Sequence, residues 1–268
     1  MNTTLDPRRV EQPFLARWLR MALELFIRSP LLLGSAIALL GWVDTSAVTL
    51  AGGYEVAQVW VDRLGLILLP ALWVLVAALA RIADDSRRMR ETLLGLVRRQ
   101  VWVGVLAGAL VLLVINLVVT WTLHGVPALL GVSAPSRYLT QSGQFVGSLA
   151  AGATITLIAF GPCYPPLLGL VPGIAYSHAR DLARKAAKIN GEFLVWCFVC
   201  VAVVTADSLS LVFPAYGMTM AACLVFLGVF NYVAYRDIFE RRSENQAATA
   251  VVPAVRFDDG SRAGAEPL

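Results

Sequence analysis

Two apolar runs constrain this chain most, because each is long enough to cross a lipid bilayer and contains no charged residue. They cover residues 101–123 and 216–235. A helix rises about 1.5 Å per residue, so about 20 apolar residues cross the roughly 30 Å hydrocarbon core. Only 15% of the chain is charged and 58% is hydrophobic. The sequence therefore predicts an integral membrane protein.

Four further apolar stretches complete a predicted all-α, polytopic transmembrane helix bundle of about six spans. Residues 64–80 are extended by apolar residues before them, and residues 193–211 contain a single acid. Residues 145–176 are long but interrupted by prolines. The first span, residues 30–50, is the least apolar because Asp44 enters before twenty apolar residues have passed.

Basic residues alternate along the chain in step with these spans. Five arginines precede the first span, six lie between the second and third, four basic residues lie between the fourth and fifth, and five follow the sixth. These segments together hold 20 of the 22 basic residues. Because Lys and Arg concentrate in cytoplasmic loops, we expect both termini to be cytoplasmic.

Three of the basic segments have the pattern of an amphipathic helix that lies in the membrane surface. They cover residues 14–26, 87–97 and 178–189. The first repeats apolar residues at spacings of three and four: Leu15, Trp18, Leu19, Ala22, Leu23 and Phe26. Such helices bury an apolar face at the headgroup boundary while their basic residues meet anionic lipid. The predicted partner is the lipid bilayer, with anionic lipid at the cytoplasmic face. Nucleic acid is not expected, because the basic residues flank the spans.

The charge pattern divides the chain into three parts. Residues 1–29 form a cytoplasmic N-terminal amphipathic segment, and residues 30–239 form the six-span transmembrane domain. Residues 240–268 are polar and rich in Gly, Pro and Ala, which predicts a disordered cytoplasmic tail.

Two polar residues inside predicted spans are candidate functional sites, because polar groups are costly in hydrocarbon. Asp207 lies in the fifth span, where it serves either as a proton or cation site or as an anchor to the outer headgroups. Asn116 lies in the middle of the third span, where its amide bonds either another helix or a substrate.

Four prolines interrupt the fourth span and give it two interpretations. They are Pro162, Pro165, Pro166 and Pro172. Proline removes a backbone donor and breaks a helix. The span is either a discontinuous helix that lines a cavity, as in transporters, or a kinked helix whose second half lies near the cytoplasmic interface. The kinked helix is favoured, because no second broken segment occurs in the chain.

Signatures of enzymes and metal sites are absent from the sequence. There is no HExxH, GxSxG or phosphate-binding loop, and no span holds paired carboxylates. The pair Cys197 and Cys200 has no second CxxC to complete four ligands, and His124 and His178 fall on opposite sides of the predicted membrane. We expect no catalytic residues, no cofactor and no metal.

Two short motifs resemble an uncharacterised bacterial six-helix inner-membrane protein family. The first is the stretch from Pro165 to Pro172, followed by the basic helix of residues 179–190 and a new span. The second is Tyr-Arg-Asp-Ile-Phe at residues 235–239. The resemblance implies an inner-membrane location and carries over no site residue.

These observations predict a non-catalytic inner-membrane protein. It would organise the membrane or act as a subunit of a membrane assembly, with protein partners there. The alternative is a transporter or channel for a small solute, built around residues 162–172, Asn116 and Asp207.

Overall fold

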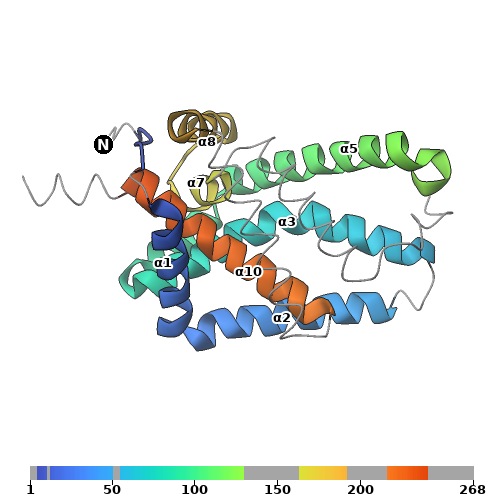
Figure 1. Ribbon diagram of the computed structural model, residues 1–268, viewed down its shortest axis with the longest axis horizontal. Helices are drawn as coiled ribbons and strands as arrows, with labels where there is room; N and C mark the ends of the chain where they lie inside the picture. Colours follow the sequence, from blue (N-terminus) through green and yellow to red (C-terminus); the bar gives the residue numbers. More distant parts are fainter. Residues whose placement is uncertain (1–4, 11–12, 51–54, 130–162, 192–215, 241–268) are drawn as a thin grey trace, which may run out of the picture.

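The computed structural model describes residues 5–10, 13–50, 55–129, 163–191 and 216–240, and every element in these ranges is helical (Figure 1). The elements are α1 (Phe14–Arg28), α2 (Pro30–Leu50), α3 (Glu55–Asp84), η1 (Ser86–Arg88), α4 (Met89–Leu96), α5 (Arg99–Leu129), α7 (Tyr164–Leu170), α8 (Tyr176–Asn190), α10 (Tyr216–Tyr235) and η2 (Arg236–Glu240). The predicted all-α class is confirmed for this part of the chain. The predicted tail, from residue 241 onward, lies outside the described residues.

Two helix boundaries agree with the sequence prediction, whereas α3 begins nine residues before the predicted residue 64. α10 has the expected bounds, and α2 begins at Pro30. Proline disfavours helical geometry in the residue before it, and Ser29 accordingly has φ −132° and ψ 57°. The three amphipathic segments are α1, α4 with the short 3-10 turn η1, and α8.

One continuous helical segment among the described residues, Gly217–Glu240, is long and apolar enough to cross a membrane. Two further helix pairs reach that length only across a bend. α1 meets α2 at 93°, and η1 with α4 meets α5 at 70°. The described residues thus support one to three crossings. The predicted number of about six stays a prediction, since the fifth span and most of the fourth lie outside the described residues.

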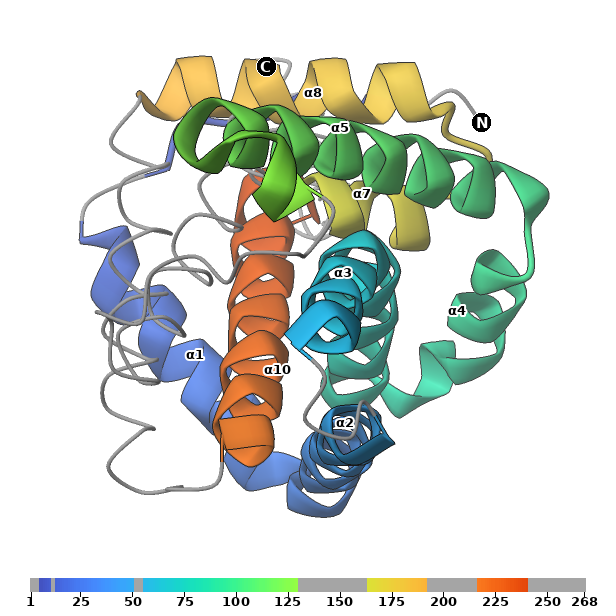
Figure 2. The ribbon, with the colours of Figure 1, turned by 90° about the vertical axis from the view of Figure 1, so that its right-hand side faces the viewer.

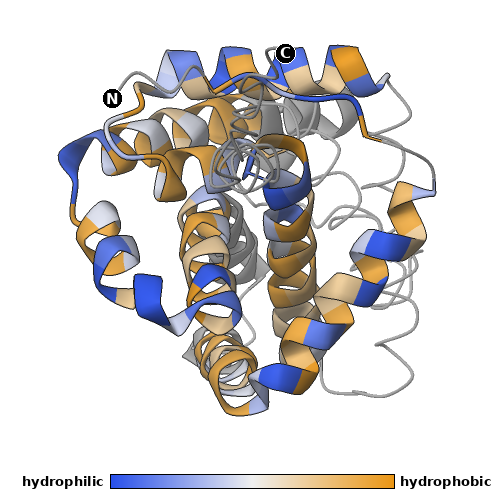
Figure 3. Cartoon of the chain, turned by 90° about the vertical axis from the view of Figure 1, so that its left-hand side faces the viewer, coloured by the Kyte–Doolittle hydropathy of each residue, from blue (hydrophilic) through white to orange (hydrophobic). Residues whose placement is uncertain are grey.

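The long helices form a bundle with the basic helices gathered at one end. α2, α3 and α5 extend along the long axis, and α10 packs against α1, α2 and α3 (Figures 1 and 2). Figure 3 looks onto the end where α1, α4 and α8 surround the ends of α3 and α10. Hydrophilic and hydrophobic residues alternate on these three helices. We call this end of the bundle the basic end.

α1 packs tightly on α10 through an aromatic contact. Trp18 is fully buried, and its ring centroid lies 4.8 Å from that of Phe14 and 5.9 Å from that of Phe230. The buried face consists of Phe14, Trp18, Ala22 and Leu25. Leu23 belongs to the apolar face that is predicted to lie at the membrane surface, and it is 53% exposed. The direction of α10 decides which face of α1 is covered, and the spacing pattern does not contain that direction.

Glycines bring α10 close to its neighbours in the bundle. A methyl group on Gly228 would overlap the side chain of Val76 in α3, and one on Gly41 in α2 would overlap Met218. Without a strong hydrophobic force between helices in lipid, close packing through small residues holds spans together. The Gly41 contact lies near the start of α10 and the Gly228 contact lies in its second half, so both halves of the helix pack closely on the bundle.

Candidate functional site

A buried carboxylate lies where α10 ends at the basic end. The side chain of Asp237 is 1% exposed. It accepts hydrogen bonds from the guanidinium groups of Arg8 and Arg17, and from Trp18 Nε1 at 2.9 Å. An isolated carboxylate is very costly to bury, so these three donors are what allow Asp237 to remain there. We call these four residues the Asp237 clasp.

Three separate segments build the Asp237 clasp. η2 continues α10 as a π-helical turn and buries Asp237, Ile238 and Phe239. α1 supplies Arg17 and Trp18 one residue apart. Residues 5–10, which we call the N-terminal strap, supply Arg8. The backbone N–H of Arg8 also donates to the Ile238 carbonyl at 3.2 Å, so the strap is anchored by main chain and side chain together.

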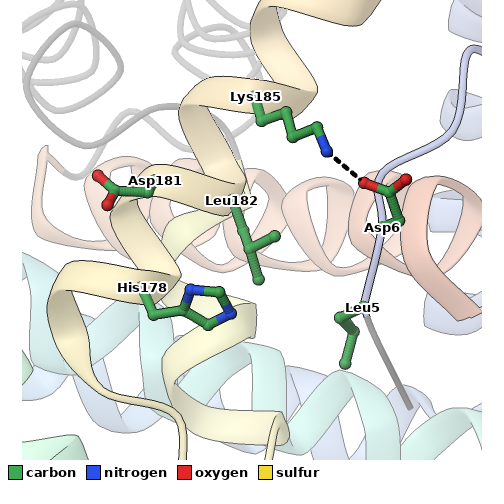
Figure 4. A pocket seen from close by; sticks show the side chains of 6 residues that line it. All are labelled: Leu5, Asp6, His178, Asp181, Leu182 and Lys185. Carbon is green, nitrogen blue, oxygen red and sulfur yellow. Dashed lines mark hydrogen bonds and ion pairs between the residues drawn. The ribbon is translucent and has the colours of Figure 1, made fainter. Parts of the chain in front are cut away.

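The N-terminal strap has a second attachment at the end of α8. Asn190 Oδ1 accepts from the backbone N–H of Val10 at 2.7 Å, and Asn190 Nδ2 donates to the Arg8 carbonyl at 3.1 Å. Lys185 Nζ lies 2.6 Å from Asp6 Oδ1 (Figure 4). The strap therefore joins α8 to the end of α10, three segments that are distant in sequence.

A hollow of about 450 Å³ lies between the strap and α8. Figure 4 shows the side chains that line it: Leu5, Asp6, His178, Asp181, Leu182 and Lys185. Its one lysine is already paired with Asp6. The lining thus mixes both charge signs and offers no dominant charge for a ligand.

A second polar cluster joins α3 to α10 beside the Asp237 clasp. Asp84 Oδ2 accepts from the Tyr232 hydroxyl at 2.9 Å and from Arg236 Nη1 at 2.6 Å. Glu240 accepts from the Tyr235 hydroxyl at 3.2 Å and lies 3.8 Å from Arg81. A hollow of about 240 Å³ is lined by Arg81, Asp84, Asp85, Arg88, Tyr232, Arg236 and Glu240. The charges here hold the two helix ends together.

The described part of the predicted fourth span contains the short helix α7, which is buried in the protein. All seven of its residues are buried, including Pro165 and Pro166. Cys163 precedes it with φ +70°, a left-handed conformation outside the helix. The side-chain oxygen of Asn231 accepts from the Cys163 N–H at 3.0 Å, and Arg81 donates to the Leu170 carbonyl at 3.0 Å. Side chains thus satisfy the backbone groups that a break in a membrane helix leaves free.

Four predicted site residues remain: Pro162, Pro172, Asn116 and Asp207. Pro172 is exposed in the turn after this helix, while Asp207 and Pro162 lie outside the described residues. Asn116 belongs to α5, and its side chain is not described. α5 meets α7 at Gly104, twelve residues earlier. At about 1.5 Å per residue, Asn116 is roughly 18 Å along the helix from that contact.

The sequence analysis missed the residues that carry the polar networks. Asp237 lies inside the Tyr-Arg-Asp-Ile-Phe motif, but its neighbours suggested only an ordinary membrane flank. The available signal was an acid placed directly after an apolar span in a strongly basic segment. Asn231 is 5% exposed inside the apolar helix α10, and its amide accepts the hydrogen bond from Cys163. A polar residue in the middle of an apolar run was the signal for this contact.

The described residues contain no group of three or more His, Cys, Asp or Glu side chains placed to hold a metal ion. Comparison of the chain with protein-family models, with curated proteins and with solved structures found no match. The described part is therefore defined by its own features. It is all-helical, has one or a few helices able to cross a membrane, and carries charge networks at one end of the bundle.

Proposed function

We propose that this protein is a non-catalytic integral protein of the bacterial inner membrane that organises the membrane or acts as a subunit of a membrane assembly. The basic end and both termini face the cytoplasm. The observation that carries the proposal is the Asp237 clasp, in which a buried charge is used to fix three segments to one another.

The bonding of the polar groups supports a structural role. An active site or transport site needs polar groups that converge on a space for substrate. Asp237 and Asp84 instead accept from neighbouring side chains of the same chain. The result is a rigid basic platform at the end of the bundle, of the kind that a lipid surface or a partner subunit can dock against.

The burial of α7 supports this proposal over a transporter. A discontinuous helix that served a solute would turn freed backbone groups toward a water-filled cavity. Here the Cys163 amide bonds Asn231 and the Leu170 carbonyl bonds Arg81. This agrees with the kinked-helix interpretation of the proline-rich stretch.

The proposal is tested by extracting the full chain from native membranes in mild detergent after cross-linking. We expect it in a species larger than the monomer that includes defined partners. A single monodisperse species without a partner would count against an assembly subunit. In proteoliposomes, a solute flux that depends on the protein and is abolished by Asp207→Asn would favour the transporter instead.

A further inference from the structure

We call α4 and the bend into α5, residues 89–102, the α4–α5 elbow. It exposes an apolar face at the basic end. Leu93 is 45% exposed, Leu94 58% and Val97 80%. Met89, one turn before Leu93, is 50% exposed. Contiguous exposed apolar residues of this kind mark an interaction surface.

The opposite side of α4 is fixed to the bundle, so the exposed face has a defined direction. Thr92 is buried, and a methyl group at Gly95 would lie 3.3 Å from the Gly169 carbonyl of α7. α4 also contacts the end of α3. The helix is therefore held against the bundle on one side, where Leu96 packs on the core, while Leu93 and Leu94 face outward.

A tryptophan holds the bend of the elbow. Trp102 Nε1 donates to the Leu96 carbonyl at 2.7 Å, which satisfies a free group at the end of α4. The backbone N–H of Arg98 donates to the Gly95 carbonyl at 3.2 Å. The Trp102 ring is 42% exposed, a setting typical of tryptophan at a membrane–water interface.

Unpaired cations surround the exposed leucines. Arg87, Arg90, Arg98 and Arg99 are exposed, and none forms an ion pair with a residue that the structure describes. Glu91 is the one exposed acid within α4. The elbow thus combines a net positive charge with an apolar wedge.

We propose that the α4–α5 elbow is a binding site for anionic phospholipid. Leu93, Leu94 and Val97 insert among the acyl chains, while Arg90, Arg98 and Arg99 bind the phosphate groups. This inference rests on the proposed membrane location and deepens it by naming the surface and the lipid class. A free phosphate ion would engage the arginines and leave the leucines exposed to water, so the apolar face selects a lipid.

The test measures the binding of phosphatidylglycerol to the purified full chain by native mass spectrometry, with phosphatidylcholine as the uncharged comparison. The variant Arg90→Gln/Arg98→Gln/Arg99→Gln removes three elbow charges. Each basic residue near an anionic surface contributes about fivefold in affinity, so we expect a loss on the order of 100-fold. The matched control Arg9→Gln/Arg28→Gln/Lys188→Gln removes the same charge elsewhere at the basic end. We expect a loss below about fivefold, because these charges do not flank the apolar face that holds the acyl chains.

A second variant, Leu93→Ser/Leu94→Ser/Val97→Ser, keeps every charge and removes the exposed apolar side chains. We expect it to weaken phosphatidylglycerol binding at least about tenfold, because buried apolar area drives interfacial insertion. Circular dichroism checks that each variant is folded.

Three results would overturn the proposal. The first is an equal loss of phosphatidylglycerol affinity in the arginine variant and its control. The second is phosphatidylglycerol binding that the serine substitutions leave unchanged and that inorganic phosphate competes away. The third is binding of an acidic protein to the elbow in place of lipid. A monomer that still binds phosphatidylglycerol at the elbow would refute the assembly role alone.

Discussion

α1 and α4 are both short basic amphipathic helices that lead into a longer helix through a bend, yet they are used in opposite ways. α1 buries Trp18 against α10, and its Arg17 pairs with Asp237. α4 exposes Leu93 and Leu94, and Arg90 beside them forms no ion pair among the described residues. The difference lies in the partner. η2, at the end of α10, provides a buried carboxylate beside α1, whereas the outward face of α4 meets no such group in the described part of the chain.

Removing the carboxylate is expected to have the largest effect on the α1 side. Asp237→Asn leaves two guanidinium groups without their counter-ion, and breaking a buried ion pair by removing one partner costs about 3–5 kcal/mol. The matched control is Asp181→Asn on α8, where the paired carboxylate is 65% exposed, against 1% for Asp237. Surface pairs contribute about 0–1 kcal/mol.

Both variants are compared by thermal unfolding of the full chain in detergent. Equal transition temperatures for Asp237→Asn and the wild-type protein would show that the Asp237 clasp does not stabilise the fold.

The two indole N–H groups give a direct comparison of α1 with the elbow. Trp18 donates to the Asp237 carboxylate at 2.9 Å, and Trp102 donates to the Leu96 carbonyl at 2.7 Å. Trp18→Phe leaves a buried charged acceptor one donor short, with an expected loss of about 1.5–3 kcal/mol. Trp102→Phe should cost about 0.5–1 kcal/mol, because water or lipid headgroups reach the freed carbonyl. A larger loss for Trp102→Phe in the same unfolding assay would reverse the proposed contrast.

The N-terminal strap is expected to loosen when its attachment to α8 is removed. Asn190→Ala deletes the acceptor for the Val10 N–H and the donor to the Arg8 carbonyl, with an expected loss of about 1–2 kcal/mol. Hydrogen–deuterium exchange should rise at residues 5–10 while exchange in α4 stays unchanged. The control is Lys188→Ala, on an exposed position of the same helix. Unchanged exchange at the strap would mean that Arg8 and the Lys185–Asp6 pair hold it without Asn190.

The sequence predicted helices well because each depends on residues close together in the chain. Uninterrupted apolar length gave the bounds of α10, and Pro30 marked the start of α2. The Asp237 clasp could not be predicted in this way. Arg8 and Asp237 are 229 residues apart, and neither position by itself distinguishes a buried pair from a charged membrane flank. The same limit applies to the face of α1 that the protein buries, since the position of α10 leaves Leu25 buried and Leu23 exposed.

Ionic strength separates the exposed and buried parts of the strap's attachment, and it gives the smallest expected effect. Lys185 and Asp6 are each 55% exposed, so Lys185→Gln should cost about 0–1 kcal/mol at low salt. At 1 M salt the Debye length falls to about 3 Å, and the cost should vanish. The cost of Asp237→Asn should persist at the same salt, because a buried pair is screened far less. Thermal unfolding of both variants at about 0.05 M and 1 M salt measures this difference. If high salt reduced the unfolding cost of both substitutions equally, solvent would reach Asp237. The contrast between α1, whose charges pair inside the protein, and α4, whose apolar face is exposed, would then no longer hold.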